Sequence, residues 1–461
     1  MQDECFFSNF SYDPQMYYFL YVGEMKSYGL NAFVENNLSI ELNRQVRCLA
    51  VVPDIQAQYY LPDLIVPACP GDDNPPRQSR NPVSFRRKIS EFLQEVSNSA
   101  FIRGVIDTIL ENQDQLYLSL FESDPAMTLD LRKNVHLLGP DKALAKKLNN
   151  KAVQFQLLDG LIPMVEYSIC SDLPELLQVT GGLRSSWREG IFVSRVYSAA
   201  GVGSIITKTQ DEISAFFADD EGPFLLTRFM PHKHDPTVLG VVANEKDVYI
   251  AGVADQCIEG GNRFVGSTWP STLGPDLLHQ LSITTRRIGQ EIGKLGYRGI
   301  FGCDFIVTPD NQVLFIEVNA RKQGTTLEFC YTLEQMLPKG SPNLPELECH
   351  AVLHNSFPGN TVEPPIVPDP PLCWGTYNYK LRKQRKTNGY IPQALRERQS
   401  FARVARTELH KDYLVLGHVG SGLTVEPGTF LARVVATGKT GPDVQEGLNL
   451  GRKMIALTLE K

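Results

Sequence analysis

The chain has 461 residues, of which 42% are hydrophobic and 21% are charged, and its formal net charge is −7. The length is enough for about three domains of ordinary size with real cores. The negative charge gives no electrostatic argument for a nucleic-acid partner, and the absence of any run of 18 apolar residues predicts no membrane-spanning helix.

The first 25 residues are aromatic and carry early acids. They lack the basic start and the continuous apolar core of a secretory signal peptide. The nine cysteines contain no CxxC pair, so they predict neither a disulfide framework nor a zinc finger. We therefore expect a cytoplasmic protein that has no membrane partner.

The N-terminal part of the chain alternates strand and helix patterns. Strands are expected at 46–53, 115–121 and 134–140, and a long amphipathic stretch at 83–112 separates the first two. This alternation is typical of α/β proteins. It predicts an N-terminal α/β domain over residues 1–140.

The rest of the chain divides at a proline-rich segment. A lysine-bearing helix is expected from 141 to Gly160, at the start of a mixed section over 141–350. Six prolines fall within residues 357–371, so 351–375 is expected to be an extended crossing. Strand patterns and a final amphipathic helix then predict a small α+β domain over 376–461.

Two segments of the middle section carry candidate binding groups. Residues 190–206 read as a strand that ends in Arg195, followed by the small-residue loop "SAAGVGS" with Gly201 and Gly203. Such a loop lets backbone N–H groups approach phosphate oxygens, and a fixed cation balances their charge. An ordinary tight turn between two strands has the same pattern. Arg263, beyond a Gly–Gly turn, could reach a substrate or a γ-phosphate, or could be a surface arginine.

The segment 224–242 reads as two apolar strands that flank a polar crossing. Main-chain groups in such a crossing can bind adenine without any particular side chain. His232 and His234 flank Lys233, but a histidine pair without a third ligand is more typical of a solvated loop than of a metal site.

The stretch "CDFIVTPDNQVLFIEVN" places acids inside two strand patterns joined by a turn. If residues 309–312 form the connection, the numbers of paired residues sum to 621. Ile306 then faces Phe315, and Asp304 faces Glu317.

Asn319 lies two residues beyond Glu317 and therefore on the same strand face. Opposed like charges destabilise a sheet, and a hard divalent cation held by oxygen ligands removes that repulsion. Solvated acids at a strand end are the alternative. Cys303 should point to the opposite face, into the core.

The order of these motifs resembles the ATP-grasp superfamily, whose signature is an acid on one strand and E-x-N-x-R on the next. The resemblance covers roughly residues 135–330, and the region before it is similar to the α/β domain that precedes the grasp. It implies an ATP-grasp fold with an N-terminal pre-grasp domain and a small C-terminal domain.

The resemblance also implies roles for individual residues. It makes Asp304, Glu317 and Asn319 the ligands of Mg²⁺, two ions being expected and Mn²⁺ an alternative. It assigns ATP contacts to Lys151, Arg195, Gly201, Gly203, Thr227, Arg228, Met230 and Asp235. The family usually has Lys where Arg195 stands and Glu where Thr227 stands, which puts the phosphate geometry and the adenine contacts in question.

The activity implied is that of an ADP-forming ligase, which phosphorylates a carboxylate and lets an amine displace the phosphate. Arg321, and also Arg263, would act on the acyl phosphate or the substrate. Amino acid or peptide ligases of secondary metabolism, a mycosporine-glycine synthase type that attaches glycine to a cyclic enol, and a nucleotide-binding protein without turnover all stay open. A biotin-carboxylase type is disfavoured, because the sequence has no biotin-carrier segment.

Small-molecule partners are expected, and a homodimer stays open. The basic run 376–390 is a solvated face or a lid over anionic groups.

Overall fold

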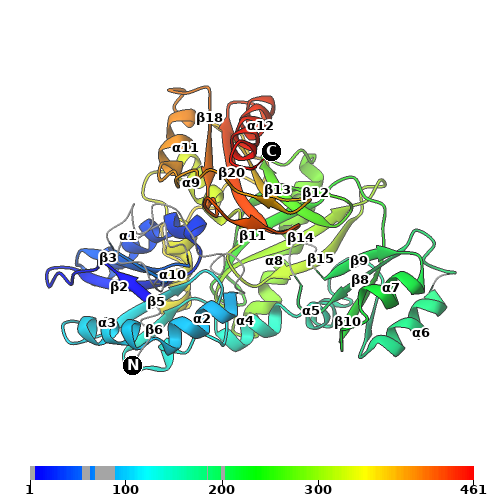
Figure 1. The fold of residues 1–461 in the computed structure, drawn as a ribbon, viewed down its shortest axis with the longest axis horizontal. Helices are drawn as coiled ribbons and strands as arrows, with labels where there is room; N and C mark the ends of the chain where they lie inside the picture. The colour runs from blue at the N-terminus through cyan, green and yellow to red at the C-terminus, as the bar shows by residue number, and fades with distance from the viewer. Residues whose placement is uncertain (1–5, 54–62, 68–88, 184, 199–202, 461) are drawn as a thin grey trace.

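The computed structural model describes residues 6–53, 63–67, 89–183, 185–198 and 203–460. Their strands form three larger sheets and one two-stranded ribbon, in which β17 (Arg385–Lys386) pairs with β19 (Thr424–Val425). Figure 1 shows the N-terminal sheet in blue and cyan, a small green sheet at the opposite end, and the longest sheet between them. Among the described residues, no helix combines the length and the apolar composition needed to cross a bilayer.

The N-terminal sheet has the strand order β1-β4-β3-β2-β5-β6, and all neighbours except β1 and β4 run parallel. Its strands are β1 (Phe6–Ser8), β2 (Tyr17–Val22), β3 (Val46–Val51), β4 (Leu64–Pro67), β5 (Leu116–Leu120) and β6 (Val135–Leu138). One face packs against α2 (Ile89–Asn98) and α3 (Ala100–Leu110), and the other against α1 (Asn31–Leu42) and α10 (Leu344–His354). The expected strands are confirmed as β3, β5 and β6.

The predicted helical stretch 83–112 contains two helices in its described part. Ser99 separates α2 from α3, and its side chain accepts a hydrogen bond from the Ile102 N–H at 3.2 Å, so it caps α3. Residues 83–88 lie outside the described residues.

The prediction of a single helix from 141 to 160 is wrong. The segment forms α4 (Lys142–Leu148) and α5 (Lys151–Leu158), because Asn150 leaves the helical conformation and its side chain accepts the Val153 N–H at 3.3 Å. This break makes Lys151 the first residue of a helix.

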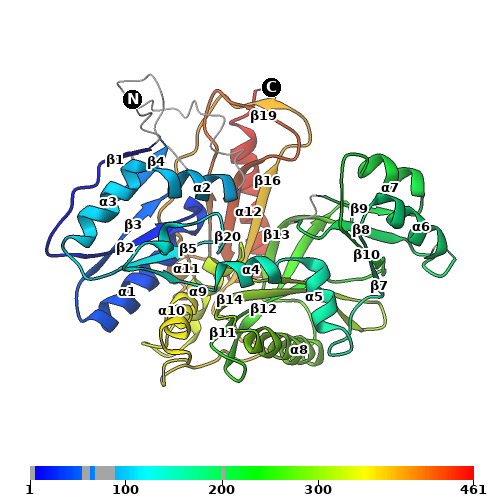
Figure 2. The same cartoon turned by 90° about the horizontal axis from the view of Figure 1, so that it is seen from below.

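The small sheet is antiparallel, with the order β7-β10-β8-β9. Its strands are β7 (Tyr167–Cys170), β8 (Ile191–Arg195), β9 (Ser204–Thr207) and β10 (Phe224–Arg228). The helices α6 (Leu173–Leu183) and α7 (Gln210–Phe216) cover one face and enclose a core around Trp187 and Phe217. In both ribbon views this sheet lies at the edge of the molecule (Figures 1 and 2).

The longest sheet is antiparallel throughout and has the order β15-β14-β11-β12-β13-β16-β20-β18. Its strands are β11 (Pro236–Val242), β12 (Val248–Glu259), β13 (Arg263–Trp269), β14 (Gly299–Val307), β15 (Val313–Asn319), β16 (Cys373–Lys380), β18 (Lys411–Leu416) and β20 (Phe430–Gly438). Its helices are α8 (Pro275–Lys294), α9 (Thr326–Met336), α11 (Glu397–Ala405) and α12 (Gly441–Ala456).

The C-terminal region is therefore not a separate sheet. Residues 355–372 hold no helix or strand, as the prolines predict, but β16 then pairs with β13 through Thr268 and Gly375. Strands β16, β20 and β18 thus extend the sheet that carries the acidic hairpin, whereas β17 and β19 pair only with each other. The expected boundary at 376 divides one sheet, because the pairing of β13 with β16 is non-local and leaves no signal in the pattern of either strand.

Candidate active site

The acidic hairpin forms as β14 and β15, and Asp304 pairs with Glu317 as predicted. The pairing closer to the turn is wrong by one residue, since Ile306 pairs with Leu314 and not with Phe315. The connection is one residue longer than expected, and a β-bulge at Ile316 restores the register. The longer connection and the bulge compensate each other at Asp304 and Glu317, so the two acids lie on one face of the sheet.

The surroundings of the Asp304 carboxyl disfavour its charged form. Burial, and after it the charge of Glu317, raises the pKa of Asp304 to about 6. Its Oδ2 accepts a hydrogen bond from Asn319 Nδ2 at 3.0 Å, whereas its Oδ1 is buried without a partner in the part of the chain that the structure describes. An orphaned carboxylate oxygen beside a second carboxylate suits a hard cation. Cys303, on the other face, is fully buried in the core as expected.

Lys151 joins this acidic pair from α5. Its ammonium forms an ion pair with Glu317, and the residue is only 8% exposed. Its backbone N–H donates to the Val196 carbonyl at 2.9 Å, just beyond β8. Lys151 therefore stands where the acidic hairpin meets the small sheet.

Two side chains that the sequence analysis did not single out hold β15 in place. Gln154 exchanges hydrogen bonds with the backbone of Val318, accepting at 2.8 Å and donating at 2.6 Å. Asn149 accepts the Ala320 N–H at 2.9 Å. Because β15 is an edge strand, these amides satisfy backbone groups that would otherwise stay unpaired. The adjacent asparagines at 149 and 150 were the available signal, since asparagine favours helix ends.

Arg321 continues the polar chain beyond Asn319, and its expected role at the acyl phosphate stays a prediction. Its Nη2 donates to Asn319 Oδ1 at 2.8 Å, and its Nε lies 3.8 Å from an oxygen of Glu122, which follows β5. Burial raises the pKa of Glu122. Gly302, opposite Asn319, leaves room for the Gln323 side chain, which a Cβ there would overlap.

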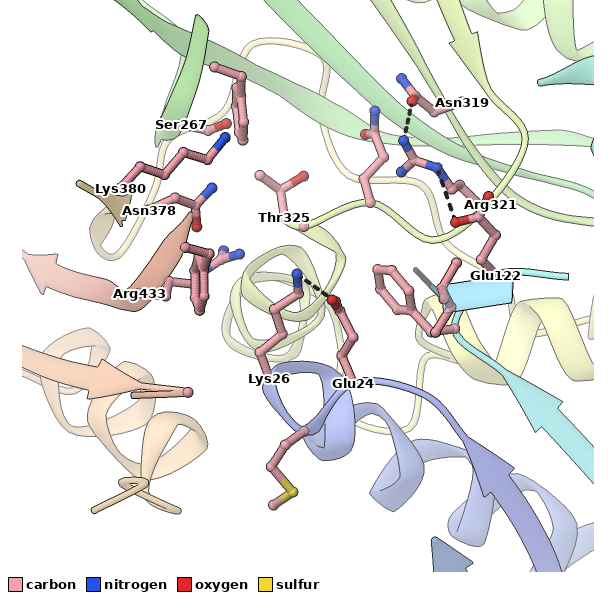
Figure 3. A pocket seen from close by; sticks show the side chains of 18 of the residues that line it. Glu24, Lys26, Glu122, Ser267, Asn319, Arg321, Thr325, Asn378, Lys380 and Arg433 are labelled. Atoms are coloured by element: carbon pink, nitrogen blue, oxygen red, sulfur yellow. Dashed lines mark hydrogen bonds and ion pairs between the residues drawn. The ribbon is translucent and has the colours of Figure 1, made fainter. Parts of the chain in front are cut away.

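A cavity of about 530 Å³ opens beside this chain. Asp304, Glu317, Asn319 and Arg321 line one part of it, and much of the rest is lined by residues that follow strands of the N-terminal sheet and by residues of β13, β16 and β20. Figure 3 shows Asn319, Arg321 and Glu122 on one side and Ser267, Asn378, Lys380 and Arg433 on the other. The volume fits a small molecule.

Arg195 is not brought to this cavity. Its guanidinium pairs with Asp220 at 2.7 Å, and strand alternation places it with Ile191 and Val193 on the face that α6 and α7 cover. A phosphate contact would require this ion pair to open. Gly203 adopts a φ of 78°, which glycine tolerates, and its carbonyl accepts the Arg195 N–H at 3.1 Å. Gly201 lies outside the described residues.

The expected adenine segment follows β10. Thr227 is buried between β7 and β8, and Arg228 pairs with Glu166 at 2.8 Å and Glu189 at 3.3 Å. The Met230 carbonyl accepts a hydrogen bond from the ring of His232 at 2.7 Å. The nucleotide contacts of this segment stay a prediction.

Two further assignments have side-chain partners in the structure. Asp235 lies 3.0 Å from His232 and raises the pKa of that ring, so this histidine serves an ion pair. Arg263 pairs with Glu259 and does not line the cavity. The expected ATP contact of Asp235 and the expected substrate contact of Arg263 stay predictions.

Comparison with known proteins identifies the domain. Residues 189–325 match the family model described as an ATP-grasp domain. The chain is 32% identical over 89 residues, 19% of its length, to the L-propargylglycine–L-glutamate ligase of Streptantibioticus cattleyicolor, and 23% identical over 222 residues, 46% of its length, to the butirosin acyl-carrier-protein–L-glutamate ligase of Niallia circulans. It spans only 18% of the first relative and 52% of the second.

Similarity to solved structures extends over nearly the whole chain. The N5-carboxyaminoimidazole synthase from Aspergillus clavatus, in complex with ADP and 5-aminoimidazole ribonucleotide, superposes with a TM-score of 0.57 at 14% identity. The match covers 96% of this chain and 99% of that one. The structural likeness, the matched domain and the position of the acidic hairpin all indicate the same fold. The chain contains an ATP-grasp domain and adopts the ATP-grasp fold.

Proposed function

We propose that the protein is an ATP-dependent carboxylate–amine ligase that releases ADP and phosphate. The observation that carries the proposal is the continuous polar chain from Lys151 through Glu317, Asp304 and Asn319 to Arg321, which ends in a cavity of substrate size. Protein relatives that are ligases support it. Mere nucleotide binding would not require an arginine at the substrate end of the chain.

The donor set fits magnesium. Asp304, Glu317 and Asn319 offer carboxylate and amide oxygens, and the Oδ1 of Asp304, which has no partner among the described residues, is available to a cation. The bound ion would neutralise charge that develops on the transferred phosphoryl group.

The chain's own residues then have distinct tasks. Lys151, held at the start of α5, would bind nucleotide phosphates once it exchanges Glu317 for them. A substrate carboxylate oxygen attacks the γ-phosphorus, and ADP leaves. Arg321, oriented by Asn319 and Glu122, would bind the resulting acyl phosphate. The amine nitrogen attacks the acyl carbon, phosphate departs, and the nitrogen loses a proton.

The cysteines support the compartment that we propose, the cytoplasm. The seven cysteines that the structure describes are all free, and five of them are buried. Free thiols in a folded core are typical of a reducing environment.

The test is product analysis. The protein is incubated with ATP, Mg²⁺ and pairs of amino acids and carboxylic acids, with glycine and a cyclohexenone enol as a further pair, while ADP, AMP and phosphate are followed. We expect ADP and phosphate only when an amino acid and a carboxylate are both present, because the attack falls on the γ-phosphorus. AMP formation would refute the mechanism. Release that requires glycine and the enol would identify the mycosporine type, and nucleotide binding without turnover for any pair would identify a binding protein.

A further inference from the structure

The basic run 376–390 does not behave as one unit in the structure. Asn378 and Lys380 alternate onto the cavity face of β16 and line the cavity. Tyr377 and Tyr379 point to the other face and pack in the cluster that contains α12. The basic residues from Arg382 to Lys386 are exposed. A single lysine of the run therefore faces the site, and the others form surface.

Lys380 lacks the counter-ion that the other cations of the cavity wall possess. These ion pairs are Lys26 with Glu24 at 2.5 Å, Arg433 with Glu328 at 2.6 Å, and Arg321 with Glu122 at 3.8 Å. Within the described ranges, the Lys380 ammonium has no hydrogen bond or ion pair. Burial, and then the charges of Arg263 and Lys26, lower its pKa. Its surroundings thus favour an anion that the chain itself does not supply.

Unpartnered neutral donors also line the cavity. The Ser267 hydroxyl is fully buried, and the Thr325 hydroxyl belongs to a residue that is 4% exposed; neither has a hydrogen-bond partner among the described residues. A buried hydroxyl without a partner costs about 1–3 kcal/mol. Figure 3 shows Ser267, Asn378 and Lys380 together on the side of the cavity opposite Arg321. An anion bound there has oxygens to offer to the ammonium and to the hydroxyl.

We propose that Ser267, Asn378 and Lys380 form a distal anion subsite, which binds a carboxylate or phosphate group that a substrate carries away from its reacting group. Arg433, whose Nε is buried without a partner among the described residues, contributes positive charge from β20. One substrate is then at least a dianion, or an amino acid whose carboxylate is held at the distal subsite. The reacting end at Arg321 rests on the proposed function, whereas anion binding at the distal subsite does not.

The first test measures, by calorimetry, how tightly small anions bind to the full chain. The probes are glutarate, inorganic phosphate and butyrate, the last being a monoacid. Wild-type protein should bind glutarate or phosphate more tightly than butyrate, and Lys380→Met should weaken that binding about 10-fold or more, as expected for a hydrogen bond to a charged group. Lys383→Met, an exposed lysine of the same run, is the matched control and should bind as wild type does. Equal binding of all three probes by wild type would overturn the proposal.

The second test separates this inference from the proposed function. With active substrates, Lys380→Met should raise the KM of one substrate about 10-fold or more and leave kcat and the KM of ATP unchanged; the substrate affected identifies the source of the anion. Ser267→Ala, which removes no charge, should raise the same KM and serves if Lys380→Met does not fold. Turnover with identical constants in Lys380→Met and Lys383→Met would overturn the subsite alone. Loss of anion binding in Lys380→Met, without turnover by wild type on any pair, would overturn the ligase and retain the subsite.

Discussion

Asp304 and Glu317 face each other across one hairpin, yet their surroundings differ. Glu317 has a cationic partner in Lys151, whereas Asp304 has an amide donor from Asn319 and one oxygen that has no partner among the described residues. Removing the charge of Asp304 relieves repulsion and leaves the Lys151 ion pair intact. Removing the charge of Glu317 leaves a nearly buried ammonium without its partner, which is strongly unfavourable.

We therefore expect Asp304→Asn and Glu317→Gln to differ in stability although both lose ATP turnover. In EDTA at pH 8, Asp304→Asn should be as stable as wild type or more stable, by up to about 3 kcal/mol, the equivalent of its raised pKa. Glu317→Gln should be less stable by about 3 kcal/mol. Urea denaturation measures both changes. Full turnover by either variant at saturating Mg²⁺ would show that the acids do not hold the metal.

The sequence was sufficient for the acids because strand alternation and a turn are local properties. It was insufficient for Ile306 and Phe315, because a bulge is a local deviation that no alternation pattern announces. The Lys151–Glu317 contact was not predicted either, since it depends on where α5 docks against the hairpin.

At the scale of elements, the small sheet is the part whose role at the nucleotide stays a prediction. Its strand β8 ends in Arg195, which the structure holds in an ion pair with Asp220, and residues 199–202 lie outside the described residues. The expected strand is confirmed as β8, and the glycine loop after it stays a prediction. The sequence could not predict the ion pair, because Asp220 lies 25 residues further along the chain.

If Arg195 replaces the lysine that the family usually has, Arg195→Ala should weaken ATP binding by about 1.5–3 kcal/mol, the range for hydrogen bonds to charged groups. Arg195→Lys should recover part of the loss. Asp220→Ala is the control, because it frees the guanidinium, and it should bind ATP at least as tightly as wild type. Calorimetric titration with ATP measures these affinities. Unchanged affinity in Arg195→Ala would limit the residue to its ion pair with Asp220.

At the scale of the whole molecule, the cavity wall collects residues from Glu24 to Arg433. The acidic hairpin could be predicted, because its partners are adjacent in sequence. The distal anion subsite could not be predicted. Ser267 and Lys380 come to the same wall of the cavity only because β13 pairs with β16, which lies about a hundred residues further along the chain. Non-local pairing of this kind also hid the continuity of the sheet across residue 376.

Because the long sheet is continuous, a charged side chain on one of its strands lies beside helices from different parts of the chain. Arg433 of β20 and Glu328 of α9 form a pair with side chains that are each 5% exposed. Glu397, the first residue of α11, is buried beside them. Burial is the largest cause of its pKa being raised from 4.5 to about 7, the charge of Glu328 adds to it, and Arg433 only partly offsets both.

This arrangement predicts a pH-dependent stability. Between pH 4.5 and about 7 the folded protein retains a proton on Glu397 that the unfolded chain has lost, so the wild type loses stability as the pH rises through that window. Glu397→Gln lacks this loss. It should match the wild type near pH 4.5 and exceed it by about 3 kcal/mol at pH 8, measured by urea denaturation at both values. Glu245→Gln, in an exposed turn, should follow the wild type throughout. A constant difference between Glu397→Gln and wild type from pH 4.5 to 8 would mean that Glu397 is ionised in the folded protein over this range, and that α11 does not bury it against the Glu328–Arg433 pair.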